Sequence, residues 1–184
     1  LFFNSIFNFS SSVFSIMGSG TAVLVFFSSL MVPTLKHKYG YWMTIVFVQG
    51  LSIFCLITLA ITELFATSHY AIYFAVSAFI LRQPLMHMAH PSSNELMMNY
   101  VGKRNQELIS ALSSSLWSAS WFISAKIFEW LRLLKFYYYE IFLITAVLYI
   151  FGVFLYAVII RQFEKMKKME KNNVITLSEE LKID

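Results

Sequence analysis

Charged residues are scarce in this chain. They make up 13% of its 184 residues, whereas 58% are hydrophobic and 18% are aromatic. Soluble domains carry about a quarter charged residues. A soluble domain of this size could not bury so much Phe, Ile and Leu in a single core. The shortage of charge therefore excludes an ordinary soluble domain and indicates a membrane protein.

Residue types needed for several kinds of chemistry are also lacking. The single Cys55 lies inside an apolar run and allows neither an internal disulfide nor a thiolate metal site. No nucleophile–base pair, paired carboxylates or metal-ligand cluster stands out, and no Gly-rich phosphate loop is present. We therefore expect that the protein is not an enzyme, does not drive transport with ATP, and binds neither a cofactor nor a metal.

The net charge of +4 does not indicate nucleic-acid binding. The positive residues sit beside the ends of long apolar runs, where cytoplasmic loops of membrane proteins collect Lys and Arg. The predicted cytoplasmic basic loops hold Lys36, Lys38, Lys103 and Arg104. The residues from Arg161 to Lys171 are also basic, whereas the second break offers only Glu63 and His69. This alternation predicts an integral protein of the cell inner (plasma) membrane with a cytoplasmic C-terminus.

Apolar runs long enough to cross a bilayer, about 20 residues each, occupy most of the chain. The sequence predicts an all-α membrane bundle over residues 1–160 and a cytoplasmic tail over 161–184. The expected helices are a partial one at about 1–10 and five full spans at 12–35, 41–64, 69–100, 107–130 and 136–160. Part of the tail is either a short amphipathic helix on an anionic leaflet or a solvated flank, and we expect it to be loose beyond Asn172. With no initiator Met or leader before Phe2, we expect the C-terminal piece of a longer protein.

Ordered motifs then give a family resemblance. They are Arg82-Gln83-Pro84-Leu85-Met86, Pro91, Tyr100-Val101-Gly102-Lys103-Arg104 and Ser113 to Trp117. Together they resemble the tenth and eleventh helices of major facilitator superfamily transporters. Residues 35–40 resemble the loop between the eighth and ninth helices, although the acidic residue and most of the Arg/Gly pattern are missing. Asn4, Asn8 and Gly18–Gly20 resemble the seventh-to-eighth transition, so the match extends almost to Ile160.

The resemblance implies the C-terminal half of a secondary active transporter of a small solute. Such proteins work by alternating access and bind substrate near the midplane between two six-helix halves. The implied partners are the lipid bilayer, a small-molecule substrate with or without a coupling proton or ion, and the N-terminal six-helix half; no nucleic acid is expected. The alternative is a transport-inactive remnant or a structural or interaction membrane protein, because half a transporter lacks half of the binding site.

Polar residues in the third full span are candidates for substrate binding or gating. On an ideal helix Gln83, His87, His90 and Asn94 fall within a narrow arc, with Arg82 at its edge. Arg82 lies about 20 Å along the helix from its start, deep in a core about 30 Å thick. A charge there needs a partner, carbonyls or a wet cavity. A structural clamp between helices is the alternative for Arg82.

The two histidines have three interpretations. No carboxylate shares their face, which disfavours a metal site. A proton relay or substrate hydrogen bonding is one remaining role, and a satisfied interhelical histidine is the other. No full span carries a deep carboxylate, so a buried acid for proton coupling is not expected in this part of the chain.

The fourth span combines small residues with tryptophans. Ser110, Ser114 and Ser118 recur every fourth residue and predict close helix packing. Trp117 and Trp121 are candidates for stacking on a substrate, with packing or lipid contact as the alternative. In the third span, Pro84 and Pro91 are expected to kink the helix.

Overall fold

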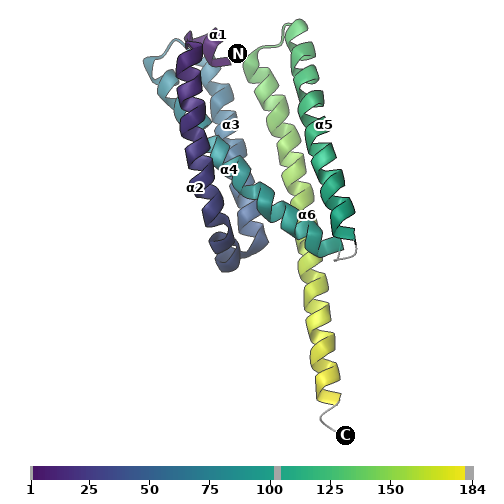
Figure 1. The fold of residues 1–184 in the computed structure, drawn as a ribbon. Coiled ribbons are helices and arrows are strands. Elements are labelled where there is room, and N and C mark those ends of the chain that lie inside the picture. The colour runs from purple at the N-terminus through teal and green to yellow at the C-terminus, as the bar shows by residue number, and fades with distance from the viewer. Residues whose placement is uncertain (1, 102–104, 181–184) are drawn as a thin grey trace.

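The computed structural model describes residues 2–101 and 105–180, with side chains through Met169 except that of Trp117. Every regular element in this part of the chain is helical, and no strand occurs in it, which confirms the all-α prediction. The elements are α1 (Phe2–Phe7), α2 (Ser11–Tyr41), the π-helical segment η1 (Trp42–Phe47), α3 (Val48–Leu64), α4 (His69–Val101), α5 (Gln106–Leu133) and α6 (Tyr138–Glu180) (Figure 1).

The predicted break after residue 35 forms a reversal at Gly40. This residue has φ 76° and ψ −176°, in a left-handed region that glycine enters without a Cβ clash. Helical hydrogen bonding continues on both sides of it, yet α2 and α3 run in opposite directions (Figure 1). The connections α2–α3 and α4–α5 lie at one end of the bundle, and α3–α4 and α5–α6 lie at the other.

Two stretches in the described residues are long and apolar enough to cross a membrane, Ser11–Leu64 and Tyr138–Met169. The first contains both α2 and α3, because the Gly40 reversal lies within it. The prediction of five full spans is therefore met only in part. The helices α4 and α5 have 33 and 28 residues, but polar residues such as Arg82 in α4 and the serines of α5 lower their hydropathy.

The last helix differs from its predicted bounds. We expected a span ending at Ile160 and a loose end beyond Asn172, but α6 continues as one helix to Glu180 and projects from the bundle (Figure 1). Residues 161–171 are rich in Lys, Glu, Met and Gln, all good helix formers, and contain neither Gly nor Pro. Nothing in this composition ends the helix at the expected boundary.

The core sits between α3 and α4, which α1 and α6 close at one end. Phe2 and Phe3 of α1 are buried against Leu59 of α3, Ala75 of α4 and Tyr138 of α6. A second cluster, near the other end, joins Ile45, Leu96 and Ile160, each almost fully buried. These contacts hold α1, α3, α4 and α6 together and leave α5 at the side of the bundle.

The peripheral position of α5 creates the space that defines the site. Its principal packing is with α4, and its large apolar side chains are exposed, including Leu108 at 70% and Phe122 at 68%. In the most apolar stretch of α6, only 11% of the residues are buried. Both helices therefore present apolar surface outwards, and a cavity remains between α5 and the rest of the bundle.

Candidate functional site

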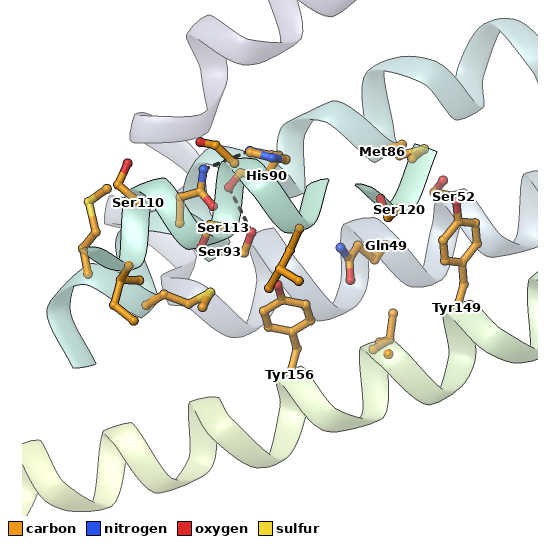
Figure 2. Close-up of a pocket in the computed structure, with 18 of the residues that line it drawn as sticks. Gln49, Ser52, Met86, His90, Ser93, Ser110, Ser113, Ser120, Tyr149 and Tyr156 are labelled. Atoms are coloured by element: carbon orange, nitrogen blue, oxygen red, sulfur yellow. Dashed lines mark hydrogen bonds between the residues drawn. The ribbon is translucent and has the colours of Figure 1, made fainter. Parts of the chain in front are cut away.

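A cavity of about 690 Å³ lies between α3, α4, α5 and α6 (Figure 2). Gln49 and Ser52 contribute from α3, and Tyr149 and Tyr156 contribute from α6. Residues three or four apart share a helix face, and residues seven apart return after two turns, so each pair points to one side. Figure 2 shows both tyrosine rings projecting from α6 into the same space.

The α4 wall contains two of the predicted candidates, His90 and Asn94. A hydrogen bond of 3.1 Å joins Nδ2 of Asn94 to Nδ1 of His90. An amide NH₂ group donates, so this bond fits a neutral imidazole with its proton on Nε2. Ser93 also lines the cavity, and its hydroxyl donates to the backbone carbonyl of His90 at 2.9 Å. The pair is therefore held in place by its own helix.

The remaining members of the predicted arc do not line the cavity. Gln83 is half-buried and His87 is exposed. The predicted arc assumed one neighbour along the whole helix, but α4 crosses the bundle obliquely, and the cavity borders mainly its second half (Figure 1). Pro84 and Pro91 lie inside the helix as predicted, and each removes a backbone donor there.

Arg82 lies beside the cavity rather than in its wall. Its Nε is buried and makes no hydrogen bond, and its Cζ lies 6.0 Å from the ring centroid of Tyr149, which lines the cavity. The ion pairs of the described residues, Lys36–Glu95 and Lys126–Glu129, do not include it. The guanidinium therefore has an aromatic neighbour, at the outer limit of cation–π contact.

The serines of α5 occupy a different environment from the one predicted. Ser110, Ser114 and Ser118 line the cavity and are exposed, instead of packing closely against another helix. The reason is the position of α5 at the side of the bundle, which leaves its small-residue face without a helix pressed against it. Trp121 is 60% exposed and is not part of the cavity wall. The side chain of Trp117 lies outside the described residues.

A polar cluster ties the α2–α3 reversal to α4. Lys36 donates to Oε1 of Glu95 at 2.6 Å, and the Tyr41 hydroxyl donates to the same oxygen at 3.1 Å. Asn99 donates to the Tyr41 hydroxyl at 3.0 Å. Of the predicted basic loops, Lys36 thus has a defined partner, and the Lys38 ammonium lies 5.2 Å from the ring centroid of Tyr39. Lys103 and Arg104 lie outside the described residues.

Sequence analysis did not identify several residues that line the cavity, among them Gln49 and Ser52 of α3 and Tyr149 and Tyr156 of α6. Gln49 and Ser52 are polar positions three residues apart in an otherwise apolar helix, which is a detectable signal. Tyr149 and Tyr156 gave no such signal, because the last span is rich in aromatic residues throughout. Among the described residues, no group of three His, Cys, Asp or Glu side chains is placed to hold a metal ion.

Comparisons with family models, with curated proteins and with solved structures found no match to this chain. Its function is therefore inferred from the geometry of the cavity and from the chemistry of the surfaces around it.

Proposed function

We propose that the chain is the C-terminal six-helix half of a secondary active transporter of the major facilitator type. The cavity between α3, α4, α5 and α6 is its share of the solute pathway. The observation that supports this proposal best is a cavity inside the bundle whose largely apolar wall carries hydroxyl and amide groups from four helices, whereas the outside of the bundle exposes large apolar side chains. In this scheme α2 to α6 supply the five full spans, and α1 is the end of the sixth.

The outer surface supports a lipid environment. Phe26 of α2 is 61% exposed, and Leu148 and Phe151 of α6 are 65% and 62% exposed. Water would make such a surface costly, at roughly 25 cal/mol for each Å² of apolar area. Lipid chains cover it at no such cost, and each helix satisfies its own backbone groups as a bilayer demands.

The cavity supports solute passage rather than a structural role alone. Its volume suits a small molecule, since ligand sites span about 300–1,000 Å³. Hydroxyl and amide groups from α3 to α6 replace part of the hydration shell of a bound solute. In this scheme an N-terminal six-helix half supplies the opposite wall, and rocking of the two halves exposes the site to each side in turn.

Thiol accessibility tests this proposal. In a Cys55→Ala background, we expect Asn94→Cys and Ser113→Cys, in the cavity wall, to react with a small water-soluble thiol reagent in lipid nanodiscs. The matched controls Leu148→Cys and Phe151→Cys, on the outer face of α6, should react at least tenfold more slowly, because lipid excludes the reagent and suppresses the thiolate. Equal rates at all four positions would overturn the proposal.

A second observation separates the transporter half from a transport-inactive remnant. The coding sequence upstream of Leu1 should encode six further spans in one reading frame. A reading frame that starts close to Leu1 would favour the remnant.

A further inference from the structure

We propose that the solute is an anion, and that Arg82, which lies beside the Tyr149 end of the cavity, attracts it. This inference rests on the proposed function and adds the charge class of the substrate. It starts from Arg82, whose Nε is buried without a hydrogen bond. A guanidinium carries five N–H donors in a planar fork that suits carboxylates and other oxyanions. The donors of Arg82 are not matched by a carboxylate in the part of the chain that the structure describes.

The position of Arg82 directs its charge toward the cavity. It lies one turn before Met86 on α4, and Met86 is part of the cavity wall. Its Cζ lies 6.0 Å from the ring centroid of Tyr149, which reaches the cavity from α6. Arg82 therefore lies next to residues of the cavity wall on both α4 and α6. The 6.0 Å from Arg82 to the Tyr149 ring is shorter than the screening length of about 8 Å at physiological salt, so the charge of Arg82 still acts on a solute beside that ring.

The carboxylates on this side of the bundle stand outside the cavity. Glu63 and Glu140 accept hydrogen bonds from the backbone at the start of α6, about 15 Å along that helix from Tyr149. The described residues that line the cavity include neither Asp nor Glu. The carboxylate of Glu95 lies 13 residues from Arg82, about 20 Å along α4, and Lys36 neutralises it. Glu107 is exposed at the start of α5. Arg82, at 6.0 Å from the Tyr149 ring, is therefore closer to this end of the cavity than any of these carboxylates.

The uncharged groups in the wall also suit an anion. Serine and tyrosine hydroxyls and the amides of Gln49 and Asn94 donate hydrogen bonds. Figure 2 places Ser52 and Tyr149 near one end of the cavity and His90, Ser110 and Ser113 toward the other. An oxyanion drawn to the Tyr149 end meets hydroxyl donors there. The same hydroxyl and amide groups also have acceptor oxygens and so bind either charge, but a cation would meet the repulsion of Arg82 with no carboxylate in the wall to offset it.

Charged thiol reagents of matched size test the inference. The chain carries Cys55→Ala and one new cysteine, at Met86 beside Arg82, at Ser113 farther away, or at Thr67 in the exposed α3–α4 connection. An anionic and a cationic methanethiosulfonate react with each protein in lipid nanodiscs. The ratio of their rates is divided by the ratio at Thr67→Cys, which removes the intrinsic reactivity of the reagents.

We expect the normalised ratio to favour the anionic reagent by about tenfold at Met86→Cys and by less at Ser113→Cys, because the field falls with distance. Adding Arg82→Gln should bring the ratio at Met86→Cys close to one. Arg82→Lys keeps the charge and should preserve the preference, and it remains informative if Arg82→Gln does not fold. Tyr149→Phe keeps the ring and should also preserve it.

The outcomes separate the two proposals. Reaction of both reagents with a normalised ratio near one, or a preference for the cation, would overturn the anion inference and leave the pathway intact. A preference for the anion that persists in Arg82→Gln would also overturn it. Failure of both reagents to reach Met86→Cys and Ser113→Cys would contradict the proposed function itself.

Discussion

The contribution of a single residue to stability depends on how exposed it is, as the two ion pairs among the described residues illustrate. The side chains of Lys36 and Glu95 are 27% and 45% exposed, and Tyr41 donates a further hydrogen bond to Glu95. Lys126 and Glu129 are three residues apart on α5 and both more than 60% exposed. Solvent weakens such exposed pairs until their contribution is barely measurable. The first pair joins α2 to α4, whereas the second joins two positions on one helix.

We therefore predict different costs for the same substitution in the two pairs. Glu95→Gln should lower the free energy of unfolding by about 1 kcal/mol, since Lys36 loses its counter-charge and the Tyr41 hydrogen bond weakens. Glu129→Gln is the matched control and should leave stability unchanged. Reversible unfolding of the protein in detergent micelles measures both. Equal effects would show that the Lys36–Glu95 contact does not bind the helices together.

At the scale of elements, buried alanines of α4 line its contact with the neighbouring helices. Ala71, Ala75 and Ala78 are 4%, 0% and 5% exposed, and their spacing of four and three residues places them on one face. Ala75 and Ala78 share a buried cluster with Cys55 and Leu59 of α3. Small side chains let two helix backbones approach. Close packing through regularly spaced small residues, which the sequence predicted for the serines of α5, therefore occurs at the alanines of α4.

A larger side chain in this stripe should separate the helices. Ala75→Leu should lower the free energy of unfolding by about 1–3 kcal/mol, because the core around it has no room for added methyl groups. Ala125→Leu, on the exposed face of α5, is the control and should cost nothing measurable. Thermal unfolding of both variants in the same detergent gives the comparison. An unchanged Ala75→Leu would contradict tight α3–α4 packing.

How far the sequence predicts these elements depends on the kind of information each requires. The positions of the helices could be predicted because hydropathy and breaks such as Gly40 act locally along the chain. The contact between His90 and Asn94 could also be predicted, since residues one helical turn apart lie next to each other. The exposure of His87 and the contact of Arg82 with Tyr149 could not be predicted, because both depend on the angle at which α4 crosses its neighbours. Crossing angles arise from packing among several helices and leave no periodic trace in one of them.

At the scale of the whole molecule, the two ends of the bundle are chemically different. The α2–α3 reversal carries Lys36 and Lys38, and α6 leaves the bundle at that end with Lys165, Lys167 and Lys168 (Figure 1). At the opposite end, Lys126, Arg132 and Lys135 are balanced by acidic residues such as Glu129, and the backbone N–H of Tyr139 donates to the carboxylate of Glu63. Basic residues are retained on the cytoplasmic side of a membrane.

This asymmetry predicts the orientation in the membrane. In intact cells and a Cys55→Ala background, Lys38→Cys and Lys168→Cys should resist a membrane-impermeant thiol reagent. Tyr137→Cys, 62% exposed at the opposite end, should be labelled. All three should react once the cells are permeabilised, which controls for buried thiols. Labelling of Lys38→Cys or Lys168→Cys from outside would reverse the proposed orientation.

Because α6 is one unbroken helix, any tilt of its part inside the bundle also displaces the part that projects from it. The helix has 43 residues and would be about 65 Å long, more than twice the thickness of a bilayer core. About 20 of these residues extend past Ile160, a rod of roughly 30 Å with no glycine or proline hinge. A tilt of about 10° inside the bundle would sweep its far end through about 5 Å. Movements of the bundle would therefore be amplified beyond the membrane surface.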